Sequence, residues 1–154
     1  MIALLTNDDG IYAPGLAALE DAITKDYQTL VVAPSTEQSG VGHGITFLSP
    51  LTAKEVFRAE QRRGWAVDGS PADAVKLGVS EICQHRPELI ISGINAGLNA
   101  GINVLYSGTV AAAIEGAFFS ITSIAISLEW DEQMDFVRAA EVARGLVKKI
   151  ISLD

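Results

Sequence analysis

The chain has 154 residues, 49% of them hydrophobic, which is enough to bury a sizeable core in one ordinary domain. Its formal net charge of -8 argues against a nucleic-acid polymer as partner, because such partners require many contacts between basic side chains and phosphates. With one cysteine, Cys83, and two histidines, the chain offers no internal disulfide and no cluster of soft ligands, so zinc is not expected.

The sequence predicts no membrane segment. No window approaches a continuous apolar span long enough to cross a bilayer. The N-terminus begins directly with a strand pattern, instead of the charged and then apolar segments of a secretion signal. We therefore expect a cytoplasmic protein with no membrane partner, folded as a single domain over residues 1–154.

Two adjacent carboxylates follow the first apolar run. The run Leu4-Leu5-Thr6 predicts a buried central strand, and Asp8 and Asp9 come just past its carboxyl end. Ligands bind at that end of the strands in open α/β sheets. Two carboxylates so close together repel each other unless a hard divalent cation such as Mg²⁺ binds both. The alternative is structural: Asp9-Gly10 makes a turn, and Asp8 caps the helix that starts near Pro14.

The rest of the chain alternates between helical and strand patterns, which predicts an α/β fold. Helical patterns cover residues 15–25, 70–82 and 110–118 and the C-terminal region, and strand patterns cover residues 28–33, 88–92 and 123–128. Two further stretches, 45–57 and 65–67, alternate loosely around Pro50. They predict short strands or a hairpin at one edge of the sheet.

Two of the predicted helices have recognisable N-caps. Ser70 precedes Pro71, and Asp73 completes a pattern like a capping box. The buried stripe of this helix comprises Ala72, Val75, Val79 and Ile82. We expect Asp131 to cap the final amphipathic helix. Its apolar stripe comprises Phe136, Val137, Ala140, Ala143, Val147 and Ile150.

Polar loops rich in small residues follow two further strands. Residues 35–44 should lie beside Asp8 and Asp9, because sequential strands usually neighbour each other. Residues 93–103 form a loop of glycines and asparagines that is longer than ordinary connections, and this length indicates a functional role. Ser107-Gly108-Thr109 then opens a helix, and a helix N-terminus with such small residues is a ready anion site.

Several common sites are missing from the sequence. A Walker A loop needs Gly-Lys-Ser/Thr, and a dinucleotide fingerprint needs Gly-x-Gly-x-x-Gly after the first strand; the chain has neither. A Ser-His-acid triad has little support, because His85 precedes Pro87 in a turn and His43 is the only other histidine. A phosphoacceptor receiver, which also has an acidic pair after its first strand, needs a lysine after its last strand. This chain has Leu128-Glu129-Trp130 there.

A series of motifs, in order along nearly the whole chain, resembles the survival protein E (SurE) family of nucleotidases. The motifs are Thr6-Asn7-Asp8-Asp9-Gly10 with Ala13-Pro14-Gly15, Val32-Ala33-Pro34 followed by Gln38-Ser39-Gly40, Gly69-Ser70-Pro71-Ala72-Asp73, Ser92-Gly93-Ile94-Asn95-Ala96-Gly97-Leu98-Asn99, and Tyr106-Ser107-Gly108-Thr109-Val110-Ala111-Ala112-Ala113-Ile114-Glu115-Gly116. The resemblance implies a Rossmann-like three-layer αβα fold with a mostly parallel sheet. It also implies a divalent-metal-dependent phosphatase that hydrolyses nucleoside 5′- and 3′-monophosphates.

The resemblance also implies roles for individual residues. In the family, the ligands of one divalent metal ion, Mg²⁺ or Mn²⁺, match Asp8, Asp9, Ser39 and Asn95. Asp8 and Asp9 are then the catalytic residues, and we expect Asp8 to accept a proton from the attacking water. The chemistry of phosphate monoesters adds a phosphate site of amides and hydroxyls at Gly40, Asn99, Ser107, Gly108 and Thr109.

These roles have structural alternatives. Ser39, Asn95 and Thr109 could instead make ordinary loop or cap hydrogen bonds. His43 could protonate the leaving alkoxide or could be an exposed loop residue. In these structural alternatives, none of the four residues takes part in the reaction. The positions of their side chains relative to Asp8 and Asp9 decide between a functional and a structural role.

Family members continue beyond the end of this chain with a segment that includes an arm exchanged between subunits. The chain is therefore either a truncated form or an unusually short homologue. We expect a homodimer or homotetramer, because the pattern of the final helix leaves apolar surface uncovered. The alternative function is a non-catalytic nucleotide-binding or assembly module, which applies if the missing segment is required for catalysis.

Overall fold

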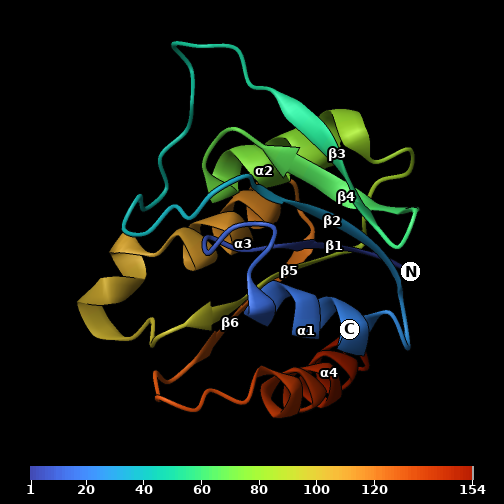
Figure 1. Ribbon diagram of the computed structural model, residues 1–154, viewed down its shortest axis with the longest axis vertical. Coiled ribbons are helices and arrows are strands. Elements are labelled where there is room, and N and C mark those ends of the chain that lie inside the picture. Colours follow the sequence, from blue (N-terminus) through green and yellow to red (C-terminus); the bar gives the residue numbers. More distant parts are fainter. Residues whose placement is uncertain (154) are drawn as a thin grey trace.

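The computed structural model describes residues 1–153 and has a six-stranded sheet between two layers of helices (Figure 1). The strand order is β3-β4-β2-β1-β5-β6. The strands are β1 (Ile2–Thr6), β2 (Gln28–Pro34), β3 (Ala53–Arg58), β4 (Gln61–Val67), β5 (Leu89–Ala96) and β6 (Thr122–Leu128). The helices are α1 (Pro14–Ile23), α2 (Pro71–Leu77), α3 (Gly108–Phe118) and α4 (Phe136–Ile151), with a π-helical turn at Gly78–Ile82 and a 3-10 helix at Gly101–Tyr106.

The sheet is parallel except at one edge. In the middle, Leu4 of β1 is level with Leu30 of β2 and Ile90 of β5. At one edge, β3 and β4 form an antiparallel hairpin, and β4 runs parallel to β2. The carboxyl ends of β1, β2, β5 and β6 therefore meet at the same edge of the sheet. The predicted mostly parallel sheet and the edge hairpin are confirmed, although residues 45–52 form no regular strand.

Successive residues of β1 point to opposite faces, so the sheet has one core on each side. Leu5 packs in one core with residues of α1 and with Ala143 of α4. Leu4 packs in the other core with Ala74 of α2 and Ala112 of α3. Figure 1 shows the same pairing, with α1 and α4 together on one side of the sheet. The expected three-layer αβα architecture is therefore confirmed.

The N-terminus of α2 has the predicted capping box. Ser70 Oγ accepts a hydrogen bond from the Asp73 backbone N–H at 3.1 Å, and the Asp73 carboxylate accepts one from the Ser70 N–H at 2.9 Å. Ala72 and Val75 of the predicted stripe are buried. The α-helix is shorter than predicted, because a π-helical turn follows it over Gly78–Ile82.

The start of α4 differs from the prediction. Asp135, not Asp131, is the N-cap, and its carboxylate accepts a hydrogen bond from the Arg138 N–H at 2.9 Å. Asp131 instead accepts a hydrogen bond from the Gln133 N–H at 2.8 Å, in the turn before the helix. The prediction was wrong because an aspartate can satisfy a turn as well as a helix N-terminus, and here the turn uses the first of the two aspartates.

The buried stripe of α4 is also narrower than predicted. Ala140, Ala143 and Val147 are buried, but Val137 is 71% exposed and Ile150 is 40% exposed. The helix packs mainly against α1, so only a seam at the spacing i, i+3, i+7 is covered. None of the helices within residues 1–153 is long and apolar enough to cross a membrane.

Candidate active site

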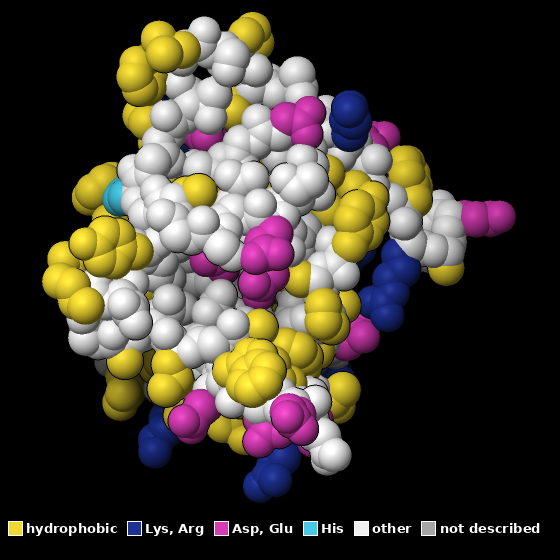
Figure 2. All heavy atoms as spheres, turned by 60° about the vertical axis from the view of Figure 1, so that its left-hand side comes forward, with side chains coloured by type: hydrophobic (Ala, Val, Ile, Leu, Met, Phe, Trp, Pro, Cys, Tyr) yellow, Lys and Arg dark blue, Asp and Glu magenta, His cyan; other side chains and the backbone are white. Residues whose placement is uncertain are grey.

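A hollow of about 490 Å³ lies where β1, β2 and β5 end. Most of its wall is polar or charged, and it is lined by Asp8, Asp9, Glu37, Ser39, Gly40, Asn95, Ala96, Leu98, Asn99, Asn103, Tyr106, Ser107 and Trp130. Figure 2 turns this edge of the sheet toward the viewer, with acidic side chains in the middle of the face and Lys and Arg toward its margins. None of the described residues that line the hollow is Lys or Arg, so its wall is negatively charged.

Helix α3 holds Asp8 at this hollow. Asp8 is only 7% exposed, and its Oδ1 accepts a hydrogen bond from the hydroxyl of the fully buried Thr109. Gly108 permits this close approach, because a Cβ there would lie 2.8 Å from the Asp8 Cβ. The N-cap of α1 is Ala13, which makes no side-chain cap bond. The alternative in which Asp8 caps α1 is therefore wrong.

Asp9 lies beside Asp8 and contacts the end of β5. Its Oδ2 accepts a hydrogen bond from the Ala96 N–H at 3.3 Å. Burial, followed by repulsion from Asp8, raises the pKa of Asp9, and Glu37 adds a smaller repulsion. None of the described residues that line the hollow is basic, so no Lys or Arg there neutralises the two carboxylates. A carboxylate pair without a basic partner is a feature of cation-binding sites.

The loop after β2 brings Ser39 and Gly40 to the hollow. The Gln38 N–H donates a hydrogen bond to the Asp8 carbonyl oxygen at 2.7 Å, which fastens this loop to the end of β1. The Ser39 hydroxyl donates to the Glu37 carboxylate. Ser39 therefore lines the same hollow as the acidic pair, in agreement with the expected position of this loop beside Asp8 and Asp9.

The end of β5 and the loop after it supply another part of the wall, because β5 continues through Ala96, beyond the predicted strand at 88–92. The Asn95 side-chain nitrogen donates to the Gly97 carbonyl oxygen at 2.7 Å, so the Asn95 side-chain oxygen remains as the atom that can bind a cation. The Asn99 side-chain nitrogen donates to the Ser127 hydroxyl at 2.8 Å. This second bond ties the long loop of glycines and asparagines to the end of β6.

The structure brings most of the predicted site residues together. The predicted residues that line the hollow are Asp8, Asp9, Ser39, Gly40, Asn95, Asn99 and Ser107. Gly108 and Thr109 do not line it but contact Asp8. Ser107 is the N-cap of α3, and its Oγ accepts a hydrogen bond from the Val110 N–H at 3.1 Å. The metal-binding and phosphate-binding roles of these residues remain predictions.

Sequence reasoning missed part of the wall. Glu37, Asn103, Tyr106 and Trp130 also line the hollow. Glu37 lies in the predicted polar loop, two residues before Ser39, so its position carried a signal. The signal for Trp130 was weaker, because it depends on the carboxyl end of β6 reaching the same edge of the sheet as the other parallel strands.

His43 lies outside this wall. Its Nε2 lies 2.8 Å from Glu115 Oε2, and its ring stacks on Phe118 with 5.4 Å between the ring centroids. The side chain of His43 is 29% exposed, whereas Glu115 on α3 is buried. His43 therefore links its loop to α3 through Glu115 and Phe118. Its position outside the hollow does not support a role as the general acid that protonates the leaving alkoxide.

The donor atoms of the hollow suit a hard cation. Carboxylate, hydroxyl and amide oxygens are ligands that Mg²⁺ and Mn²⁺ accept, whereas zinc sites favour sulfur and imidazole. Within residues 1–153, no three or more His, Cys, Asp and Glu side chains are grouped to hold a metal ion. A cation bound by Asp8 and Asp9 would therefore also depend on neutral oxygens such as those of Ser39 and Asn95.

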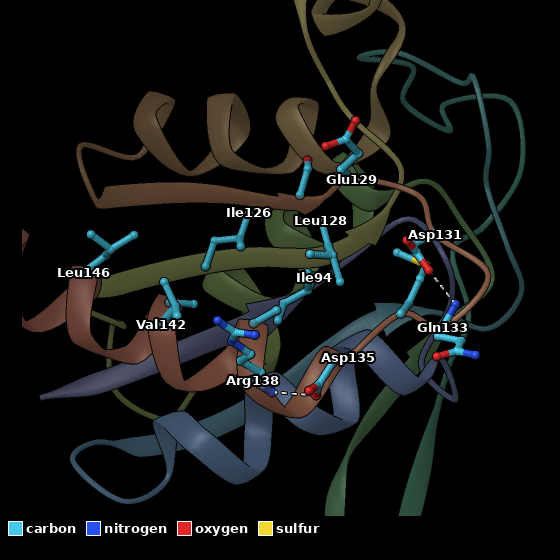
Figure 3. A pocket seen from close by; sticks show the side chains of 14 residues that line it. Ile94, Ile126, Leu128, Glu129, Asp131, Gln133, Asp135, Arg138, Val142 and Leu146 are labelled. Carbon is cyan, nitrogen blue, oxygen red and sulfur yellow. Dashed lines mark hydrogen bonds between the residues drawn. The ribbon is translucent and has the colours of Figure 1, made fainter.

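A second hollow, of about 500 Å³, lies between β6 and α4 (Figure 3). Apolar side chains dominate it, including Ile94, Ile126, Leu128, Val142 and Leu146. Glu129 and Asp131 lie at one end of this groove in Figure 3. None of the residues predicted for the site lines this groove, so we place the candidate active site at the acidic pair.

The structure defines an α/β protein with an acidic pair in a hollow at the carboxyl edge of a mostly parallel sheet. The family model described as "Survival protein SurE" matches residues 3–154 of the chain. The chain belongs to the SurE family, as its motifs predicted.

Similar proteins support this membership. The chain is 57% identical over 152 residues to the 5′-nucleotidase SurE of Rhodopirellula baltica, covering 98% of this chain and 60% of that protein. It is 49% identical to the 5′-nucleotidase SurE of Syntrophus aciditrophicus, covering 96% of this chain and 56% of that protein. The crystal structure of the SurE protein from Aquifex aeolicus has a TM-score of 0.91 and 41% identity, covering 99% of this chain and 60% of that one. The chain thus spans less than two thirds of the length of these relatives.

Proposed function

We propose that this chain carries the catalytic part of a divalent-metal-dependent phosphomonoesterase. The reaction is hydrolysis of nucleoside 5′- and 3′-monophosphates to nucleoside and phosphate. The observation that carries the proposal is the pair Asp8 and Asp9, which lies beside the N-terminus of α3 in a hollow with no Lys or Arg among its described lining residues. The relatives named 5′-nucleotidase support the reaction class. The 3′ activity and the metal dependence rest on the resemblance of the site motifs.

Asp8, Asp9, Ser39 and Asn95 would hold one Mg²⁺ or Mn²⁺ ion. When bound, such an ion supplies a Lewis acid that neutralises charge on the phosphoryl oxygens. The chain positions the two carboxylates from different sides: the Thr109 hydroxyl donates to Asp8, and the end of β5 donates to Asp9. These bonds fix the carboxylates before substrate arrives, which is the condition for efficient electrostatic catalysis.

The N-terminus of α3 is the part of the site suited to an anion. The first amides of a helix have no intrahelical acceptor, and the helix dipole adds partial positive charge there. The phosphate would bind to amides and hydroxyls of Gly40, Asn99, Ser107, Gly108 and Thr109. Asp8 would accept the proton of the attacking water, because it lies at the same wall as Ser107.

The same site limits the partners. The substrate is a nucleoside monophosphate, and the negative wall of the hollow disfavours a nucleic-acid polymer. Apolar side chains exposed on α4, including Val142 and Leu146, support a homodimer or homotetramer. A cytoplasmic setting agrees with a metal ion and a nucleotide as the ligands.

A second candidate function is a non-catalytic nucleotide-binding or assembly module. The chain covers 60% of the Rhodopirellula baltica relative, and the rest of that protein could supply groups that turnover requires. In this case the chain would bind nucleotide and metal at the same hollow without releasing phosphate.

Phosphate release from AMP, with Mg²⁺ or Mn²⁺ and with EDTA, separates the two functions. We expect release that EDTA abolishes, and loss of release in Asp8→Asn and Asp9→Asn with the fold intact, because each change removes a charged ligand. Asp21→Asn on α1, a side chain that is 60% exposed, is the matched control and should keep full activity. Binding of AMP without release would favour the module. Near-normal turnover by Asp8→Asn at saturating Mg²⁺ would contradict the metal assignment.

A further inference from the structure

An exposed indole stands on the wall of the acidic hollow. Trp130 lines this hollow together with Asp8 and Asp9, yet it is 67% exposed. A tryptophan ring has a large apolar face, and most of that face is covered in folded proteins. An uncovered ring beside a ligand site offers surface that a ligand with a flat face can cover.

The course of the chain fixes the side on which this ring lies. Residues 129–131 follow β6 without regular secondary structure. Glu129 and Asp131 line the groove beside α4, whereas Trp130 between them lines the acidic hollow. The indole therefore lies at the hollow of Asp8 and Asp9 and not at the groove beside α4.

The end of β6 is bonded to the loop that follows β5. The Gly97 N–H donates to the Leu128 carbonyl oxygen at 2.8 Å, and the Asn99 side chain donates to the Ser127 hydroxyl at 2.8 Å. Trp130 is only two residues beyond Leu128. The segment before Trp130 is therefore tied to the loop that directly follows the predicted metal ligand Asn95 of β5.

Two other exposed side chains extend the apolar part of the wall. Tyr106 is 61% exposed and Leu98 is 56% exposed, and both line the same hollow. The hollow thus combines carboxylates with aromatic and aliphatic surface. Its volume of about 490 Å³ is within the range of about 300–1,000 Å³ that is usual for small-molecule sites. A nucleoside monophosphate has the same two parts, a charged phosphate and a flat, uncharged base.

We propose that Trp130 forms a nucleobase subsite. Its indole stacks on the base of the nucleotide whose phosphate lies beside Asp8 and Asp9, a proposal that rests on the proposed function. Stacking requires no positive side chain, in agreement with a wall that has no Lys or Arg among its described residues. Because larger rings cover more of the indole, purine nucleotides bind better than pyrimidine nucleotides.

Substrates with and without a base test this subsite. Wild type and Trp130→Ala are compared in the presence of Mg²⁺ on AMP and on ribose 5-phosphate, which has the sugar and phosphate but no base. Loss of a base–aromatic stack weakens binding by about 5- to 150-fold. We expect the KM for AMP to rise by this factor with kcat little changed, while the kinetics on ribose 5-phosphate stay the same. Trp130→Phe, which keeps a ring, should restore most of the loss.

The second tryptophan offers a control and a direct readout. Trp65 lies on β4, with its ring 5.9 Å from the Arg62 guanidinium, and does not line the hollow. Trp65→Phe should keep the wild-type kinetics. Since the chain has two tryptophans, Trp130 is then the remaining indole. In this variant AMP should quench the fluorescence, and ribose 5-phosphate should not.

The outcomes are distinct. Equal losses of Trp130→Ala on both substrates, or no loss on either, would overturn the subsite. If the wild-type chain hydrolyses neither substrate, the proposed function fails, and the fluorescence titration of Trp65→Phe decides. Quenching by AMP but not by ribose 5-phosphate then supports a nucleobase subsite in a binding module, and absence of quenching overturns it.

Discussion

Gly108 is the position where one added methyl group tests the geometry of the acidic pair. A Cβ at this position would lie 2.8 Å from the Asp8 Cβ, 3.0 Å from the Pro71 Cγ and 3.1 Å from the Asp8 Oδ2. Carbon atoms pack at about 3.5–4.0 Å, so Asp8 must retreat by roughly 1 Å in Gly108→Ala. A displacement of that size at a reacting group lowers the rate by about 100-fold, and we expect this loss in kcat.

Stability should change much less than rate. Alanine is favoured over glycine in a helix by roughly 0.5–1 kcal/mol, which offsets part of the roughly 1–3 kcal/mol that overpacking costs. The free energy of unfolding of Gly108→Ala should therefore fall by about 2 kcal/mol or less. Gly145→Ala is the matched control, because Gly145 lies within α4 and a Cβ there would meet nothing within 4 Å. This control should gain slightly in stability and keep full activity.

Both quantities are measured on the same samples. The kcat is measured on AMP at saturating Mg²⁺, and stability is taken from thermal unfolding. If Gly108→Ala kept the kcat of wild type and melted normally, the reasoning would be refuted. Such a result would mean that Asp8 can shift by about 1 Å without consequence, and hence that its position does not limit the reaction.

Three further predictions follow from the same contacts. Thr109→Val keeps the side-chain shape but removes the donor to Asp8; kcat should fall roughly 10- to 100-fold, and an unchanged kcat would reduce Thr109 to a packing residue. The raised pKa of Asp9 means that the folded, metal-free chain binds this proton more tightly than the unfolded chain. The resulting stability is present at low pH and is lost as pH rises through that raised pKa, so melting temperatures should show this loss in wild type and not in Asp9→Asn. Exposed apolar side chains on α4, Val137, Val142 and Leu146, predict self-association, which a clean monomer in sedimentation at micromolar concentration would contradict.

The place of the acidic pair was predictable from the sequence for a physical reason. The run that ends at Thr6 is apolar enough for a central strand, and the parallel neighbours of that strand end at the same edge. Ser39 lies in the loop after β2, and Asn95 lies at the end of β5. The parallel order of the strands is therefore enough to predict that these side chains lie near Asp8 and Asp9.

Side-chain direction was not predictable in the same way. Gly108 and Thr109 lie at the start of α3 as expected. The first turn of a helix has one side toward the ligand and another toward the sheet, and only the packed structure shows that these two residues contact Asp8. Trp130 likewise depends on the pairing of β6 with β5, and the choice between Asp131 and Asp135 as cap depended on a local turn.

The negative charge of the hollow also affects the order in which the metal ion and the nucleotide bind. Its wall carries Asp8, Asp9 and Glu37 and, among the described lining residues, no Lys or Arg. A phosphate dianion that approaches this wall meets repulsion, whereas a divalent cation meets attraction. For the proposed reaction, the negative wall therefore favours binding of the metal ion before the nucleotide or together with it. The nucleotide concentration that gives half the maximal rate would then depend on the free concentration of divalent ion. The rate in a compartment would therefore depend on its divalent-ion concentration as well as on its nucleotide concentration.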